Sequence, residues 1–378
     1  MSREPVVKDD EALRAVDTYA PVARDVQRFV HGHPELGYEE YQSSEYLAAT
    51  LAKAGYAIER NIAGMPTAFR AVLNGARSGR TVGLVVVYDA VPTVRPDGAI
   101  EAVHSCGHGP LAGGVCAAAA ALASLREQLA GRIVVVGCPA DEIHASVALT
   151  HGGGKALTAA AGLWDGVDAA LYAHPEFINT VSRQSLWMRR DRARIFGRRS
   201  LKSEVVSTPL AVLRDLSTAL ERSDPGQVML ERLELDGDVE EGTSMALDAT
   251  FLLFAEDKTG IEALASGLRE GIPGVTWTHG SLVCGVQPDD NVTQAVSEAF
   301  VAAGRDFDDN PPTLPFATDF GNISRLVPAA LIGIGRAGGW RYHTDEGAGE
   351  FASSAGDDAA LGIAKVLTLA ATRLSEAS

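Results

Sequence analysis

The chain has 378 residues, of which 46% are hydrophobic and 22% charged, and its net charge is −16 at pH 7. This composition is typical of globular proteins, and the length allows two domains rather than one. The negative charge argues against binding to nucleic acids or to anionic membrane surfaces, because both partners require a basic face.

No apolar run is long enough to span a bilayer, and residues 1–5 lack the hydrophobic stretch of a secretion signal. The cysteines at positions 106, 116, 138 and 284 show no disulfide spacing. We therefore expect a cytoplasmic protein whose thiols stay reduced.

The sequence before about residue 182 alternates between helical and strand patterns. Helical periodicity covers 9–30 and 41–55, with a turn at 31–37 between them. Buried apolar strands are expected at 81–87, 132–137, 168–173 and 330–334, and further helices at 110–127 and 355–374. This alternation predicts an α/β fold with a mostly parallel, twisted sheet and helices on both faces.

The stretch 182–290 has a different pattern. It is more charged, its strands alternate between polar and apolar residues, as at 244–251, and helices are expected at 208–222 and 258–270. We therefore expect an α+β domain of residues 182–290, inserted into a catalytic domain of residues 1–181 and 291–378.

Candidate metal ligands follow the expected strands. Cys106 and His108 are two residues apart, so on an extended segment both would face the same way. Three further segments end in ligand-type side chains, namely Asp141 and Glu142 after 132–137, His174 after 168–173, and His343 beyond a glycine-rich turn after 330–334. Each side chain alone has an ordinary packing or capping explanation. Because ligands bind beyond the carboxyl ends of strands in open α/β sheets, the set together predicts one metal site.

Five ligands exceed the four that one tetrahedral zinc ion requires. A bridging carboxylate would allow two cations, each with an open position. Such a site is suited to hydrolysis, because a bound metal lowers the pKa of water and a neighbouring acid can take up the proton.

The chain resembles the metallopeptidase family of aminoacylases, glutamate carboxypeptidase-type enzymes and auxin-conjugate amidohydrolases, and it is most similar to the branch with a cysteine ligand. The motifs that carry this resemblance are HGHPELG at 31–37, HSCGH at 104–108, PADE at 139–142, AHP at 173–175, ATDFGN at 317–322 and HT at 343–344. The resemblance implies a metal-dependent exopeptidase-like fold and an inserted lid domain that usually forms a homodimer. It also implies a small-molecule substrate and one or two divalent ions, most often manganese or zinc. Carried over by position, the metal ligands would be Cys106, His108, Glu142, His174 and His343, with Asp141 as the general base.

The chain departs from the family pattern in three places. Relatives have Glu at the position of Asp141, and the segment 197–203 has Leu201 where relatives carry a histidine that donates to the oxyanion. The strand at 81–87 leads into Tyr88 and Asp89 instead of a His-x-Asp motif, so Asp89 is expected to support the site rather than bind metal.

Four more residues have open roles. Asp319 either lines the site or shapes a helix start, and His144 either contacts substrate or is exposed. Trp340 and Tyr342 flank His343 and either stack on an aromatic substrate or pack in the core.

The function expected from this pattern is metal-dependent hydrolysis of a C–N bond, with removal of an acyl or aminoacyl group as the first hypothesis. The second is an aminohydrolase that displaces an amino group from an activated aromatic amine such as a nitro-substituted anthranilate, since that reaction needs no carbonyl oxyanion donor. The third is an inactive homologue that still binds metal.

Overall fold

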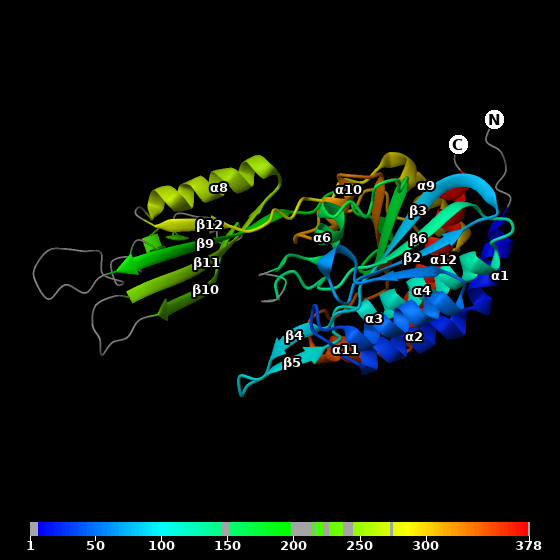
Figure 1. Cartoon of the computed structure of the whole chain (residues 1–378), viewed down its shortest axis with the longest axis horizontal. Helices are drawn as coiled ribbons and strands as arrows, with labels where there is room; N and C mark the ends of the chain where they lie inside the picture. The colour runs from blue at the N-terminus through cyan, green and yellow to red at the C-terminus, as the bar shows by residue number, and fades with distance from the viewer. Residues whose placement is uncertain are drawn as a thin grey trace, which may run out of the picture. The chain divides into compact units, whose positions relative to one another are not determined.

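The computed structural model describes residues 7–145, 148, 151–197, 214, 216–218, 220–221, 227–236, 245–272 and 275–376 (Figure 1). The chain divides into two compact units. Unit 1 comprises Met1–Gln184, Val286–Thr313 and Asp319–Ser378, and unit 2 comprises Ser185–Gly285 with Leu314–Thr318. The short segment Leu314–Thr318 therefore groups with unit 2, which the sequence did not indicate.

Unit 1 contains a seven-stranded sheet with the order β1-β2-β6-β3-β7-β13-β8. Its strands are β1 (Ala57–Arg60), β2 (Phe69–Asn74), β3 (Arg77–Val86), β6 (Ala130–Gly137), β7 (Ala169–Glu176), β8 (Thr180–Val181) and β13 (Ala329–Gly335). The central strands β6, β3, β7 and β13 run parallel, and β1, β2 and β8 extend the sheet antiparallel at its edges. The four buried strands and the α/β fold expected from the sequence are confirmed.

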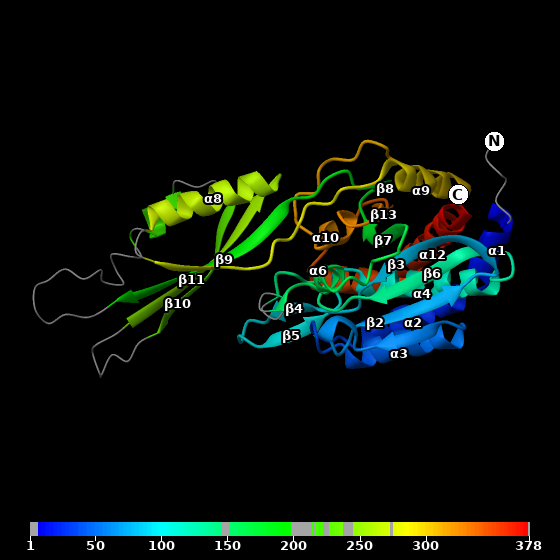
Figure 2. The same cartoon turned by 45° about the horizontal axis from the view of Figure 1, so that its top comes forward.

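Helices cover both faces of this sheet (Figures 1 and 2). They are α1 (Asp9–Thr18), α2 (Ala20–Gly32), α3 (Tyr41–Lys53), α4 (His108–Ser124), α6 (Gly154–Ala160), α9 (Asp290–Ala302), α10 (Phe320–Ser324), α11 (Asp345–Phe351) and α12 (Ser354–Glu376). Helices α4 and α12 pack on β3 and β7 with α2 behind them, whereas α10 contacts β7 and β13 from the side where α6 lies.

Helix α4 is buried along most of its length, and its composition explains how. A Cβ atom on Gly113 would lie 2.3 Å from the carbonyl oxygen of Ala23 in α2, and one on Gly114 would lie 2.6 Å from side-chain atoms of Ile363 in α12. The small residues therefore allow three helices to approach closely, which holds the start of α4 in a fixed position.

One expectation about local structure was wrong, and one element was missed. The helix expected at 9–30 is interrupted at Tyr19, because α2 restarts at Ala20 with Pro21 in its first turn, where proline is tolerated. The hairpin of β4 (Val91–Val94) and β5 (Ile100–Val103) was not foreseen.

Unit 2 contains a four-stranded antiparallel sheet in the order β10-β11-β9-β12. Its elements are β9 (Trp187–Gly197), β10 (Val228–Asp236), β11 (Met245–Ala255), α8 (Lys258–Gly271) and β12 (Thr276–His279). Apolar side chains of β11, including Phe251 and Leu253, pack against Ile261 and Leu268 of α8 to form the core. No helix in the described part of the chain is long and apolar enough to cross a membrane.

Candidate metal centre

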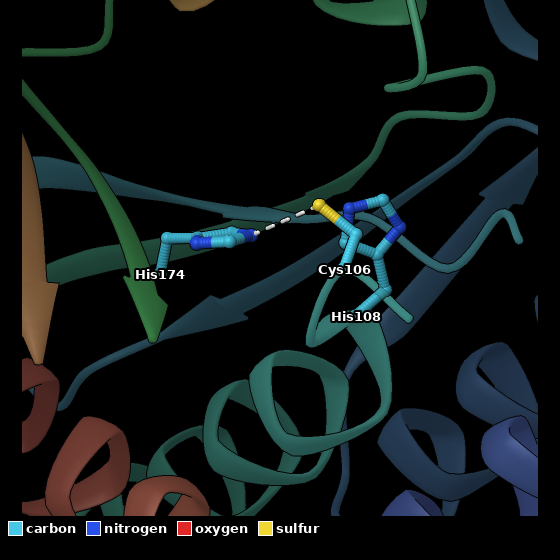
Figure 3. A group of neighbouring side chains, drawn as sticks. All are labelled: Cys106, His108 and His174. Atoms are coloured by element: carbon cyan, nitrogen blue, oxygen red, sulfur yellow. Dashed lines mark hydrogen bonds between the residues drawn. The ribbon is translucent and has the colours of Figure 1, made fainter. Parts of the chain in front are cut away.

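The five expected ligands come from four loops or strand ends of unit 1 and lie together. His174 lies near the end of β7, Glu142 follows β6, and Cys106 and His108 lie at the start of α4. Figure 3 shows the Cys106 sulfur between the imidazoles of His108 and His174, with 3.9 Å between Cys106 Sγ and His174 Nε2. His343 lies beyond β13, with its Nε2 3.8 Å from Glu142 Oε2.

These side chains form two overlapping groups. In each group the potential ligand atoms lie within 4.8 Å of one another, and the groups are Cys106, His108 and His174, and Cys106, Glu142 and His343. The side chain common to both is the Cys106 thiol, and not the carboxylate expected from the sequence.

Cys106 and His108 meet for a different reason than the sequence suggested. They do not lie on an extended segment, because Gly107 has a left-handed backbone (φ 88°) and His108 is the first residue of α4. A Cβ on Gly107 would also come within 3.0 Å of both Phe351 and Pro175, so only glycine fits this turn.

Asp89 orients two of the candidate ligands, as expected for a supporting residue. His108 Nδ1 donates to the Asp89 carbonyl oxygen at 2.6 Å and lies 3.2 Å from Asp89 Oδ1, while Asp89 Oδ2 accepts from the Glu142 N–H at 2.9 Å. Burial alone would raise the pKa of Asp89, but the hydrogen bond from His108 and the Glu142 N–H hold it below its usual value. With Nδ1 donating to Asp89, Nε2 is the ring nitrogen that faces the centre. Burial alone would lower the pKa of His108, but Cys106 and Asp89 raise it well above its usual value, so a cation would bind Nε2 by displacing its proton.

His174 is held in the same way. Its Nδ1 donates to the Pro175 carbonyl oxygen at 2.7 Å, which leaves Nε2 free to face Cys106. Burial lowers the pKa of His174 to about 3, so the imidazole is neutral at pH 7, as a metal ligand must be. The ring of Tyr342 stacks on that of His174 with centroids 6.0 Å apart.

The donor set fits a divalent cation. His108 Nε2 and Glu142 Oε1 are buried without a hydrogen-bond partner among the described residues. Burial raises the pKa of the Cys106 thiol to about 12 and that of Glu142 to about 7. A cation at this position would satisfy both orphaned atoms and stabilise the thiolate and the carboxylate, and Cys, His and Glu are the side chains that bind zinc.

Asp141 lies beside the ligands but is held by a residue that the sequence analysis missed. Its Oδ2 lies 3.3 Å from His108 Nε2 and accepts a hydrogen bond from the Tyr172 hydroxyl at 3.0 Å. Its Oδ1 forms an ion pair with Lys155, whose side chain is fully buried and also pairs with Asp319 Oδ1 at 2.7 Å. The candidate base is therefore one end of an Asp141-Lys155-Asp319 triad, in which the lysine and Asp319 are fully buried and the Asp141 side chain is 14% exposed.

The triad also explains where Asp319 lies. Its Oδ2 accepts from the backbone N–H of Ala156 at 3.0 Å, so it caps the first turn of α6, the helix that carries Lys155. No local signal marked Lys155, since a lysine after three glycines at 152–154 is usually exposed.

The remaining candidate residues lie around the centre. Trp340 is 5% exposed and stacks on Phe351, so it packs in the core of unit 1. Tyr342 packs between the rings of His174 and Phe177, and its hydroxyl donates to the Pro175 carbonyl oxygen. His144 is exposed. The pKa of His343 is lowered mainly by burial, then by the nearby His108, and to a smaller extent by His144. Leu201 lies outside the described residues.

Comparison with known proteins identifies the family of the chain. The model of peptidase family M20/M25/M40 matches residues 87–369. The chain belongs to this family. The resemblance inferred from the motifs is thus confirmed, and the matched residues include part of unit 1 and all of unit 2.

Individual M20/M25/M40 relatives match only part of their length. One component of the p-aminobenzoyl-glutamate hydrolase of Escherichia coli K12 is 34% identical over 165 residues, which are 40% of this chain and 32% of that protein. An N-acyl-L-amino acid amidohydrolase of Geobacillus stearothermophilus is 27% identical over 44% of each chain. The chain thus matches less than half the length of these curated relatives.

Solved structures share the fold over the whole chain. A putative aminohydrolase from methicillin-resistant Staphylococcus aureus has a TM-score of 0.71 at 17% identity, covering 98% of this chain and 100% of that one. The YxeP protein of Bacillus subtilis, described as a dinuclear metal-binding peptidase of the M20 family, has a TM-score of 0.70 at 18% identity, covering 95% and 99%. At these identities the likeness supports the fold.

Proposed function

We propose that the protein is a metal-dependent amidohydrolase that cleaves the amide bond of a small N-acyl or aminoacyl conjugate. The observation that carries this proposal is the convergence of five ligand-type side chains with the Asp141 carboxylate beside them, namely Cys106, His108, Glu142, His174 and His343. Two of their atoms, His108 Nε2 and Glu142 Oε1, are buried without a hydrogen-bond partner among the described residues. The printed names of the curated relatives, hydrolases of p-aminobenzoyl-glutamate and of N-acyl amino acids, are consistent with it.

The chemistry divides between the metal and the chain. One or two divalent ions, zinc or manganese, would lower the pKa of water and polarise the substrate carbonyl when bound. His108 and His174 would bind through Nε2, because their Nδ1 atoms donate to backbone carbonyl oxygens. Cys106, which belongs to both groups of ligands, would be one of the side chains that hold the metal, together with Glu142 and His343.

Asp141 is proposed to take the proton from the attacking water. A carboxylate oxygen has two lone pairs, so Oδ2 can accept from Tyr172 and still hold a proton from water. Lys155 on Oδ1 keeps the carboxylate turned toward His108. Tyr172 and Lys155 thus fix the orientation of the acid, which is one methylene shorter than the Glu of relatives.

The proposal is tested by an assay of amine release with a panel of N-acetyl-, N-benzoyl- and N-aminobenzoyl-amino acids. Release of free amine should require metal, disappear with a chelator and return with added Zn²⁺ or Mn²⁺. Release of ammonia with a hydroxylated product from a nitroanthranilate would instead indicate deamination, which the comparisons do not favour. No turnover of any compound by metal-loaded protein would indicate an inactive homologue.

We also propose that the protein is a homodimer that associates through unit 2. Strand β10 pairs on one side with β11 and is an edge of the described sheet. It exposes Met229 (49%), Leu230 (37%) and Leu233 (42%), and an exposed apolar edge strand is a template for pairing with another chain.

The dimer is tested by light scattering coupled to gel filtration. Leu233→Lys should shift the protein from dimer to monomer, whereas Leu326→Lys, at a 59% exposed leucine of unit 1, should not. A Leu233→Lys dimer as stable as the unmodified one would contradict the proposed interface.

We place the protein in the cytoplasm, because the candidate ligand Cys106 must stay a reduced thiol to bind metal and a reducing compartment keeps it so. An epitope-tagged chain should fractionate with cytoplasmic markers.

A further inference from the structure

The residue before the candidate base and ligand has an unusual backbone. Ala140 has φ 53°, in the left-handed region that residues with a Cβ rarely adopt. Asp141 and Glu142 follow directly, so the direction of both carboxylates depends on this conformation. Such a residue persists only where its surroundings hold it in place.

Glu40 holds Ala140 from a distant part of the chain. The Ala140 N–H donates to Glu40 Oε1 at 2.9 Å, and the Thr67 hydroxyl donates to Glu40 Oε2 at 2.7 Å. The Glu40 side chain is fully buried. The Thr67 carbonyl oxygen accepts in turn from the hydroxyls of Ser44 and Tyr88, so the carboxyl is fixed on both sides.

The segment 35–40 makes two further contacts with the loops that follow β3 and β6. A Cβ on Gly37 would lie 2.8 Å from the Ala140 Cβ, so the backbone of this segment packs directly on Ala140. The Glu35 carbonyl oxygen accepts from the Ala90 N–H at 2.8 Å, beside Asp89. One segment therefore contacts the loops that present Asp89, Asp141 and Glu142.

We propose that the segment 35–40 is a positioning element of the metal centre, in which Glu40 holds Ala140 left-handed so that Asp141 and Glu142 face the ligands. This role accounts for the second half of the motif at 31–37 and its continuation to Glu40, none of whose residues is among the candidate ligands. The test of this proposal by kcat rests on the proposed amidohydrolase function, whereas its test by the crystal structure of a variant does not.

The substitutions Glu40→Ala and Glu40→Gln test this directly. Glu40→Gln retains an oxygen that accepts from the Ala140 N–H and an amide that bonds Thr67, so its kcat should stay within about 3-fold of the unmodified enzyme. Glu40→Ala removes the acceptor, and its kcat should fall about 10- to 100-fold with a change in KM below about 3-fold, because misplacement of a catalytic group by about 1 Å has such an effect.

The matched control is Asp168→Ala. Asp168 Oδ2 likewise accepts from a backbone N–H, that of Thr81 at 2.8 Å, but it lies at the end of β7 opposite His174. Its loss should lower stability without lowering kcat beyond about 3-fold. Should Glu40→Ala fail to fold, Gly37→Ala provides the second variant, because the added methyl group crowds Ala140 and should lower kcat about 10-fold or more.

Two results would overturn the proposal. One is a kcat for Glu40→Ala within 3-fold of the unmodified enzyme, or a loss that Glu40→Gln shares in full. The other is a crystal structure of Glu40→Ala in which Ala140 keeps its left-handed backbone and Asp141 its position. The second result decides the proposal even if no substrate is turned over, in which case the proposed function alone would fail.

Discussion

Asp141→Asn should lower kcat by about 10²- to 10⁴-fold, the usual contribution of a general base, without lowering metal content. Asparagine has the same shape as aspartate and can still accept from the Tyr172 hydroxyl, but it cannot take a proton from water. The measurement is kcat for amine release together with metal per chain by mass spectrometry.

The control for Asp141→Asn is Asp168→Asn, at the opposite end of β7 from His174. This variant should keep its kcat within about 3-fold. Near-normal turnover by Asp141→Asn would remove Asp141 from the mechanism. A proportional loss of metal would show instead that Asp141, whose Oδ2 lies 3.3 Å from His108 Nε2, is a ligand.

Lys155→Met should lower the free energy of unfolding of the metal-free protein by about 3–5 kcal/mol, the usual cost of removing one partner from a buried ion pair. Methionine fills much of the volume of lysine but leaves Asp141 and Asp319 facing each other without a cation. The buried Asp319 carboxylate would then face the like charge of Asp141 with no cation between them, which chemical denaturation should detect as a lower midpoint.

Lys365→Met is the matched control, since Lys365 pairs with Asp17 at 3.1 Å but both side chains are partly exposed. Its cost should stay below about 1 kcal/mol, because water screens such pairs. Equal effects of the two substitutions would show that the triad contributes no more than a surface pair.

The sequence predicted most of the sheet and all five candidate ligands. The apolar runs at 81–87, 132–137, 168–173 and 330–334 are strands that have no polar face, which only a sheet covered on both sides explains. Because parallel strands end at the same edge, ligand-type residues after three of these strands had to lie near one another.

The parts that the sequence could not predict depend on contacts between distant segments. Lys155 follows a glycine-rich loop and looks like an exposed residue, and only its two aspartate partners, after β6 and at the start of α10, make its burial possible. The backbone of Ala140 is likewise set by Glu40, a hundred positions earlier. Cys106 and His108 were paired correctly but for the wrong reason, because a left-handed Gly107, and not an extended segment, brings them together.

The central claim is that Cys106, His108 and His174 bind a divalent ion together. Anomalous diffraction from crystals grown with Zn²⁺ tests it most directly. We predict a zinc peak about 2.3 Å from Cys106 Sγ and about 2.0–2.1 Å from Nε2 of both histidines. A fully loaded crystal with no anomalous peak near Cys106, or with zinc only on surface side chains, would contradict the account.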